Sequence, residues 1–211
     1  MIRIALPKGR SQQAALEALR AAGLRPEDPD DPGGLGRRLR WALEGVGVEV
    51  LLLKDWDLPR YVEEGVADCG IVGSDVLEEL DGDLLVPVRL RAGRCRLSLV
   101  GRPDALPVPG AQARLATKYP RTARRLLREL PWSAEVVELQ GSLELAPLLD
   151  LAEVALDIVQ TGRTLREHGL VELQVLREVA PCVVVNRASL QRWRPEINEL
   201  LSRMERAEVV E

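Results

Sequence analysis

Residues 157–165 carry side chains that could bind a phosphorylated sugar. Asp157 stands in an apolar run, and small or polar residues follow it: Thr161, Gly162, Arg163 and Thr164. Glycine lets a backbone approach a ligand closely, and amide groups and hydroxyls at a helix N-terminus bind anions such as a phosphate monoester. Because positions 157 and 161 of a strand point to the same face, the carboxylate would lie beside this anion, facing sugar hydroxyls or a magnesium ion. The pattern favours a ribose 5-phosphate site, and a Thr-capped helix after a strand is the alternative.

Two other segments place charged residues where a predicted strand gives way to a predicted helix. Glu144 follows the strand predicted at 135–139. It could bind the sugar, or it could simply be an acid favoured in a first turn by the helix dipole. Lys8 and Arg10 flank a glycine after the first predicted strand. Two cations at a helix N-terminus suit a multiply charged oxyanion such as pyrophosphate, with a plain basic loop as the alternative.

Other kinds of site find little support in the sequence. The chain has neither a Gly-x4-Gly-Lys phosphate loop nor a Gly-x-Gly-x-x-Gly dinucleotide motif after a strand. His168, the only histidine, stands near a predicted helix end, so a histidine-based triad is not expected. Cys69 falls in an apolar run and is expected in the core. A net charge of -4 argues against a nucleic-acid-binding protein.

Cysteine usage and the N-terminus indicate where the protein resides. The three cysteines stand far apart, without metal-ligand spacing, which favours a reduced intracellular chain. The apolar run at the N-terminus is too short for a signal peptide, and no segment approaches a membrane span. The sequence therefore predicts a cytoplasmic protein.

The residues above have to be positioned by strand and helix patterns that alternate along almost the whole chain, which predicts an α/β fold. The predicted strands are 2–6, 37–43, 46–53, 69–72, 86–90, 95–100, 114–116, 135–139, 154–159 and 182–185. Ser11 and Asp57 are the predicted N-caps of two helices, Pro120 stands in the first turn of a third, and a closing helix covers 191–207. Residues 26–34 are predicted to form an exposed loop.

No linker or internal repeat divides the chain, so two interleaved lobes are expected. The extended stretches near 88–100 and 172–186 are the predicted crossings. Lobe I is then predicted at 1–90 plus 183–211, and lobe II, which would bind the phosphoribosyl group, at 91–182.

Six segments, in the family's order, resemble the ATP phosphoribosyltransferase family, whose members catalyse the first step of histidine biosynthesis. They are LPKGR at 6–10, DLPRYV at 57–62, GVADCGIVG at 65–73, ATKYP at 116–120, GSLELAP at 141–147 and DIVQTGRTL at 157–165. The resemblance covers essentially the whole chain. It implies two α/β lobes of the type II periplasmic-binding-protein kind, with the active site in the cleft between them.

The resemblance also implies a reaction. N1 of the ATP adenine attacks C1 of phosphoribosyl pyrophosphate, with magnesium present, and the products are phosphoribosyl-ATP and pyrophosphate. N1 is a neutral nucleophile, so no strong general base is required, and the protein would align the reactants and stabilise charge on the departing pyrophosphate. A ligand-binding module of the same fold without chemistry, and a phosphoribosyltransferase for another base, are the alternatives.

Site residues follow from the resemblance, segment by segment. The implied catalytic residues are Lys8, Glu144 and Asp157, and Asp157 is also the implied magnesium ligand. The implied phosphoribosyl-pyrophosphate-binding residues are Arg10, Lys54, Thr161, Gly162, Arg163 and Thr164. The implied ATP-binding residues are Asp68 and Gly73. Lys54 stands where many relatives carry arginine, so a bidentate contact there becomes a point-charge contact. Whether Arg37 or Arg38 reaches the cleft is left open.

The chain ends at Glu211, directly after the last predicted helix, and it resembles the short form of the family. That form implies a homodimer that assembles with a regulatory subunit resembling histidyl-tRNA synthetase into a hetero-octamer. Histidine sensing would then belong to the partner.

Overall fold

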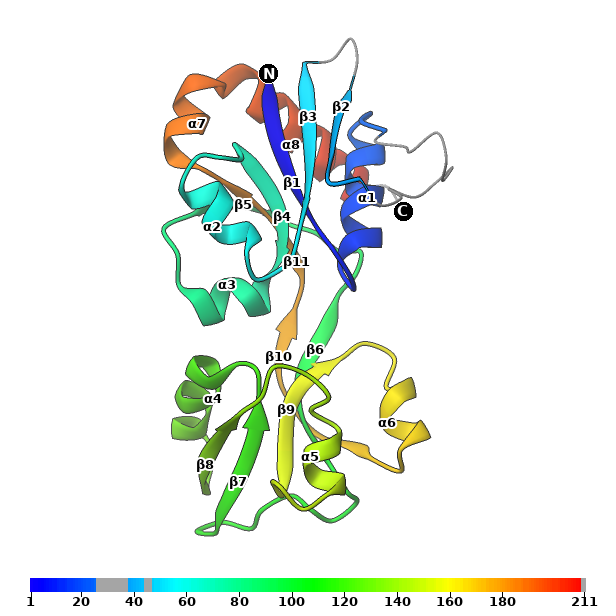
Figure 1. Cartoon of the computed structure of the whole chain (residues 1–211), viewed down its shortest axis with the longest axis vertical. Coiled ribbons are helices and arrows are strands. Elements are labelled where there is room, and N and C mark those ends of the chain that lie inside the picture. Colours follow the sequence, from blue (N-terminus) through cyan, green and yellow to red (C-terminus); the bar gives the residue numbers. More distant parts are fainter. Residues whose placement is uncertain (26–37, 44–46, 210–211) are drawn as a thin grey trace. The chain divides into compact units, whose positions relative to one another are not determined.

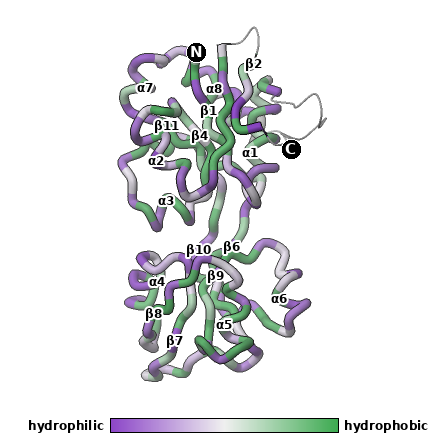
Figure 2. The backbone as a smooth tube through the Cα atoms, viewed as in Figure 1, coloured by the Kyte–Doolittle hydropathy of each residue, from purple (hydrophilic) through white to green (hydrophobic). Residues whose placement is uncertain are grey.

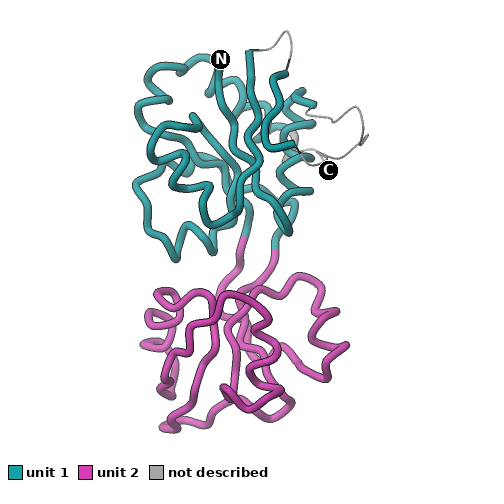
Figure 3. Tube along the Cα trace, viewed as in Figure 1, with its two compact units in different colours: residues 1–94, 180–211 teal, residues 95–179 magenta. Residues whose placement is uncertain are grey.

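The computed structural model describes residues 1–25, 38–43 and 47–209, and the chain forms two compact units (Figure 3). Unit 1 comprises Met1–Arg94 and Ala180–Glu211, and unit 2 comprises Cys95–Val179. Residues 91–94 and 180–182 belong to unit 1 rather than to the predicted second lobe. Residues 181 and 182 belong to unit 1 because they begin a strand, Pro181–Val185, that pairs within the sheet of that unit.

Unit 1 is built on a six-stranded sheet in the order β2-β3-β1-β4-β11-β5 (Figure 1). Its strands are β1 (Ile2–Pro7), β2 (Arg40–Leu43), β3 (Val48–Leu53), β4 (Cys69–Gly73), β5 (Leu85–Arg89) and β11 (Pro181–Val185). Strand β1 runs parallel to β3 and to β4, whereas β2, β11 and β5 pair antiparallel with their neighbours. The carboxyl ends of β3, β1 and β4 therefore meet at one edge of the sheet.

Helices cover both faces of this sheet. They are α1 (Gln12–Ala21), α2 (Leu58–Glu63), α3 (Ser74–Leu80), α7 (Arg187–Arg192) and α8 (Arg194–Val209). Ile4 and Leu6 pack with buried residues of α1 and α8 on one face, and Ala5 packs with α2 on the other. Side chains on both faces of β1 are therefore buried, which explains why this strand is almost continuously apolar.

Unit 2 contains a five-stranded sheet in the order β10-β6-β9-β7-β8. Its strands are β6 (Cys95–Gly101), β7 (Gln112–Thr117), β8 (Ser133–Glu138), β9 (Val154–Val159) and β10 (Val171–Val179). Its helices are α4 (Pro120–Leu126), a 3-10 turn at Leu127–Glu129, α5 (Leu145–Leu148) and α6 (Arg163–Glu167). Strand β7 is parallel to β8 and β9, and β6 is antiparallel to β9 and β10. Figure 2 shows the hydrophobic residues of each unit gathered along its strands.

The predicted α/β class is confirmed, and β9 has the predicted bounds. Strand β10 is not among the predicted strands, and most of it lies in the segment predicted as a crossing at 172–186. It lies at the edge of the sheet, and two register shifts interrupt its pairing with β6 between Glu172 and Gln174 and between Val175 and Arg177. Such irregularities break the alternation of apolar and polar residues from which a strand is predicted.

Two helix predictions also need correction. Helix α3 was not predicted, because Ser74 follows the last residue of β4 with no intervening loop. The single closing helix predicted at 191–207 is two helices, α7 and α8. Asn186 caps α7 by accepting a hydrogen bond from the Ser189 backbone N–H at 2.9 Å, and Pro195 lacks the N–H needed to continue α7 but suits the first turn of α8.

The predicted caps are only partly right. Ser11 and Asp57 occupy the N-cap positions of α1 and α2, but neither side chain makes a capping hydrogen bond. Both have nearly helical backbone angles, whereas a capping residue is normally extended. The predicted loop at 26–34 and Arg37 lie outside the described residues, and Arg38 is exposed.

Glu153 gives unit 2 a pH-dependent contribution to stability. Its carboxylate accepts hydrogen bonds from the Arg114 backbone N–H at 2.5 Å and from Arg114 Nη2 at 2.6 Å. These bonds lower the pKa of Glu153 to about 2. Because the folded-state pKa lies below the usual value, the stabilisation is present above that usual value and is lost as the pH falls toward 2.

Glu153→Gln is therefore expected to lower the free energy of unfolding at pH 7 by about 1 kcal/mol, the upper range for a partly exposed ion pair. Urea unfolding from pH 7 to pH 2 would measure it, and the difference from the unsubstituted chain should shrink steadily below pH 5. Glu178→Gln, an exposed acid in the same unit, is the control. A pH-independent difference would contradict the assignment.

Candidate functional site

A cavity of about 380 Å³ lies in unit 2 where β9 ends. Its lining residues are Val100, Glu144, Asp157, Ile158, Val159, Gln160, Thr161, Gly162, Arg163, Thr164 and Leu165. The structure therefore brings Glu144 and Asp157 together with the predicted phosphate loop. Glu144 comes from the N-terminal end of α5 and Asp157 from β9, so two separate elements supply the acids.

The turn after β9 is held by its own side chains. Gly162 has φ +68°, a left-handed conformation that favours glycine, and α6 starts at the next residue. The Thr161 hydroxyl accepts a hydrogen bond from the Arg163 backbone N–H at 3.4 Å, and Arg166 Nη1 donates to the Thr161 carbonyl at 3.0 Å. The side chain of Arg163 instead pairs with Glu167 at 2.8 Å on the exposed side of α6. The Arg163 guanidinium is thus engaged by Glu167, although Arg163 also lines the cavity.

Asp157 belongs to a row of polar side chains across the sheet. Ser98 on β6 is paired with Asp157 in the strand register, so the two side chains share a face. The Ser98 hydroxyl, which is fully buried, donates to Glu172 Oε1 at 2.6 Å. Arg96 donates to both oxygens of Glu172 at 2.9 Å, and this bonding holds the pKa of Glu172 below its usual range. This row could not be predicted from the sequence, because Glu172 lies on β10, which is not among the predicted strands.

In unit 1, four of the predicted residues gather at the carboxyl edge of the parallel strands. Lys8 follows β1 and Lys54 follows β3, and the Lys8 backbone N–H donates to the Leu53 carbonyl at 2.7 Å. Gly73 is the last residue of β4, the other neighbour of β1. Arg10 Nη2 donates to Asp75 Oδ2 at 3.2 Å, just beyond Gly73. Cations at the carboxyl ends of parallel strands are well placed for an anionic ligand.

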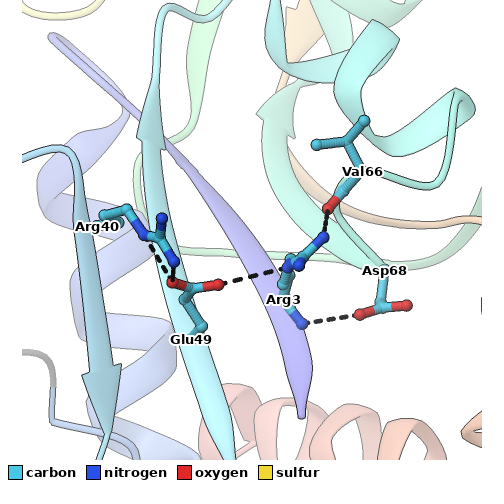
Figure 4. A network of polar contacts seen from close by, with 5 residues as sticks. All are labelled: Arg3, Arg40, Glu49, Val66 and Asp68. Atoms are coloured by element: carbon cyan, nitrogen blue, oxygen red, sulfur yellow. Dashed lines mark hydrogen bonds and ion pairs between the residues drawn. The ribbon is translucent and has the colours of Figure 1, made fainter.

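Asp68 lies at the opposite edge, before the first residue of β4 (Figure 4). Its carboxylate accepts hydrogen bonds from the Arg3 backbone N–H at 2.8 Å and from the Ser189 hydroxyl at 2.7 Å. Arg3 in turn pairs with the buried carboxylate of Glu49 at 3.3 Å. These contacts tie β1 to β3 and α7. Although only five positions separate Asp68 from Gly73, the strand between them places the two residues at opposite edges of the sheet.

Two other residues behave as the sequence indicates. Cys69 is buried in the core, as predicted, and burial, with a smaller contribution from Asp68, raises the pKa of its thiol to about 12. This thiol stays protonated at neutral pH, so it is no nucleophile. His168 is exposed at the C-terminal end of α6.

A second cavity, of about 430 Å³, lies in unit 1 and is mainly apolar. Residues from β1, β3 and α8 line it, among them Ile4, Val48 and Leu200. It holds none of the predicted site residues and includes the N-terminal residue Met1, so it belongs to the end of β1 opposite Lys8. Volume alone therefore does not identify the candidate site, whereas the convergence of acids and the loop in unit 2 does.

Similarity to known proteins identifies the family. The ATP phosphoribosyltransferase family model matches residues 54–206. An ATP phosphoribosyltransferase from Thermus thermophilus is 46% identical over 202 residues, which cover 95% of this chain and 94% of the relative. The chain belongs to the ATP phosphoribosyltransferase family. As a member of that family it is a glycosyltransferase that transfers a pentosyl group.

Further relatives of this phosphoribosyltransferase extend the match. An ATP phosphoribosyltransferase from Methylococcus capsulatus is 41% identical over 208 residues, covering 98% of this chain and 95% of the relative. A solved chain of the ATP phosphoribosyl transferase (HisG:HisZ) complex from Thermotoga maritima has a TM-score of 0.79 and 29% identity, and the match covers 98% of both chains. The predicted family and the two-sheet α/β fold of the phosphoribosyltransferase are thereby confirmed.

Among the described residues of this phosphoribosyltransferase, no helix is long and apolar enough to cross a bilayer. Cys69, Cys95 and Cys182 are all buried.

Proposed function

We propose that the chain joins ATP, through N1 of its adenine, to C1 of phosphoribosyl pyrophosphate and releases pyrophosphate, as the first step of histidine biosynthesis. One observation carries the proposal. In a member of this family, a single cavity in unit 2 is lined by Glu144, Asp157 and the turn at 161–164. The turn suits the phosphate of a ribose 5-phosphate, and the two acids suit the hydroxyl groups at the other end of the sugar.

In unit 2, we assign the backbone amides and hydroxyls of the turn to the 5-phosphate. The left-handed Gly162 brings no side chain between the turn and the phosphate. Asp157 and Glu144 then accept hydrogen bonds from the ribose hydroxyls. As the bond from C1 to pyrophosphate weakens, positive charge grows on the ribose, and a carboxylate that faces the sugar stabilises that charge.

In unit 1, we assign Lys8, Arg10 and Lys54 to the negative charge of the diphosphate. All three lie at the carboxyl edge of β1 and β3 or on the loops that leave it. Charge on the leaving pyrophosphate increases in the transition state, so cations that contact it lower the barrier without any proton transfer. N1 of adenine needs no base, which agrees with a histidine that lies exposed at the end of α6.

Magnesium is included in the proposal. In residues 1–25, 38–43 and 47–209, no three His, Cys, Asp or Glu side chains are grouped to hold a metal ion. Magnesium at phosphate substrates, however, is usually held by one or two carboxylates together with phosphate oxygens. Asp157, with Glu144 lining the same cavity, fits that donor set. When bound, the ion would neutralise charge on the diphosphate.

The proposed assembly is with a regulatory subunit that resembles histidyl-tRNA synthetase. Support comes from the Thermotoga maritima chain, which belongs to a complex described as HisG:HisZ and which this chain matches over 98% of its length. We propose that paired copies of this chain join such subunits in a hetero-octamer. The three widely spaced cysteines favour a reducing compartment, and we propose that the reaction takes place in the cytoplasm.

A pyrophosphate-release assay tests the function. The purified chain is mixed with ATP, phosphoribosyl pyrophosphate and magnesium, with and without the candidate partner. ATP-dependent release is expected, together with a product that carries the ribose on N1. Release that requires another base in place of ATP would identify a different phosphoribosyltransferase, and binding of both ligands without release would identify a module that lacks chemistry.

A further inference from the structure

Asp75 is a buried carboxylate at the same edge of the unit 1 sheet as the proposed diphosphate-binding cations. It lies in the first turn of α3, directly after β4, and its side chain is 1% exposed. Oδ2 accepts a hydrogen bond from Arg10 Nη2 at 3.2 Å, and the Arg10 side chain remains 31% exposed. Arg10 therefore has one side against a buried anion and another side toward solvent.

Gly73 explains how this carboxylate reaches Arg10. A β carbon at Gly73 would lie 2.1 Å from Asp75 Oδ1 and 3.3 Å from Asp75 Cγ. The backbone of Gly73, with φ -66° and ψ 142°, is one that any residue can adopt. Glycine is thus required for space and not for conformation, because the Asp75 carboxylate folds back over position 73.

We propose that Asp75 is a positioning residue that holds the Arg10 guanidinium in the orientation that binds the anionic oxygens of the substrate, and that Gly73 is needed to seat Asp75. This proposal rests on the proposed function, in which Arg10 contacts phosphoribosyl pyrophosphate. It also gives Gly73 a role different from the predicted contact with ATP. A flexible arginine loses side-chain entropy when it binds an anion, and a buried carboxylate that fixes it beforehand reduces that loss.

The chemistry of Arg10 and Asp75 suits a positioning role for Asp75. A guanidinium has five N–H donors in a planar fork, so an arginine that bonds a carboxylate can also bind a phosphate. Arginine stays protonated with or without its partner, so Asp75 acts on the orientation of Arg10 and not on its charge. A purely structural clamp between the β1–α1 loop and α3 would predict instead that Asp75 affects stability and leaves substrate binding unchanged.

Asp75→Asn keeps the size of the side chain and removes the charge. We expect it to weaken binding of phosphoribosyl pyrophosphate about tenfold, as for loss of one charge-assisted contact, with the KM for ATP changed less than twofold. Titration calorimetry with phosphoribosyl pyrophosphate alone measures the first quantity, and steady-state kinetics measures the second. Glu79→Gln is the matched control, because Glu79 is also a buried acid on α3 and should leave both quantities unchanged.

A double-mutant cycle decides whether Asp75 acts through Arg10. In an Arg10→Ala background, Asp75→Asn should change the Kd for phosphoribosyl pyrophosphate less than twofold, whereas independent contributions would multiply. Likewise, Gly73→Ala should weaken binding in the native background but cause no further loss beside Asp75→Ala. Three outcomes would overturn the proposal. They are effects of Arg10→Ala and Asp75→Asn that multiply, an equal loss of affinity for ATP and for phosphoribosyl pyrophosphate, and an effect of Glu79→Gln as large as that of Asp75→Asn. The calorimetric test stands even if no pyrophosphate is released, so failure of the proposed function is seen separately, in the activity assay.

Discussion

Asp157→Asn is expected to lower kcat for phosphoribosyl-ATP formation by about two orders of magnitude, the usual cost of removing one group that stabilises transition-state charge. Asparagine has nearly the same shape, so the backbone of β9 and its pairing with Ser98 on β6 should persist. In the proposed function, the substitution removes the negative charge that faces the ribose, and the amide can no longer accept hydrogen bonds with both terminal atoms. The KM for phosphoribosyl pyrophosphate should rise much less than kcat falls, because the charge on the ribose develops after binding.

Steady-state pyrophosphate release at saturating magnesium measures both constants. Asp150→Asn is the matched control, since Asp150 is an exposed aspartate of unit 2 whose φ of +56° asparagine also tolerates. Urea unfolding of both variants separates loss of function from loss of structure. If Asp157→Asn keeps kcat within threefold of the native chain while Asp150→Asn does the same, Asp157 has no part in stabilising the transition state.

The residues that line the unit 2 cavity could be grouped from the sequence because most of them are neighbours in the chain. The carboxylate, the left-handed glycine and the hydroxyls occur within residues 157–165, where one strand ends and one helix begins. Glu144 comes from a second segment of the same kind, with a strand before it and a helix after it. The rule that ligands bind at the carboxyl ends of strands then brings both segments to one edge.

The parts that could not be predicted depend on pairing between distant segments. Arg10 and Asp75 are 65 positions apart and meet only because β1 and β4 are parallel neighbours. Glu172 reaches Ser98 because β10 pairs with β6, and its two register shifts hide that strand from a search for alternation. Asp68 and Gly73, which the resemblance implies for ATP binding, lie before and at the end of β4, and their different places also depend on the fold.

Removing the charge of Lys8 is the second large effect expected. Lys8→Ala should lower kcat by about two orders of magnitude and raise the KM for ATP by less than threefold, because its contact with the diphosphate strengthens as the bond to C1 breaks. Lys8 is exposed, and its backbone N–H is bonded to the Leu53 carbonyl at 2.7 Å, a contact that alanine retains. The loop should therefore keep its path, and the change in rate should report the lost ammonium group alone.

Lys8→Arg and Lys54→Arg supply the comparison. Both keep a positive charge at the edge formed by β1 and β3, and Lys54→Arg also introduces the residue that the family resemblance leads us to expect there. Lys8→Arg should recover a large part of the lost turnover, since the diphosphate needs charge more than it needs a particular geometry. Lys54→Arg should keep or increase affinity for phosphoribosyl pyrophosphate, because a guanidinium can bind phosphate with two hydrogen bonds. An unchanged kcat in Lys8→Ala would remove Lys8 from the proposed mechanism, and equal losses in Lys8→Ala and Lys8→Arg would mean that its role depends on the shape of lysine and not on its charge.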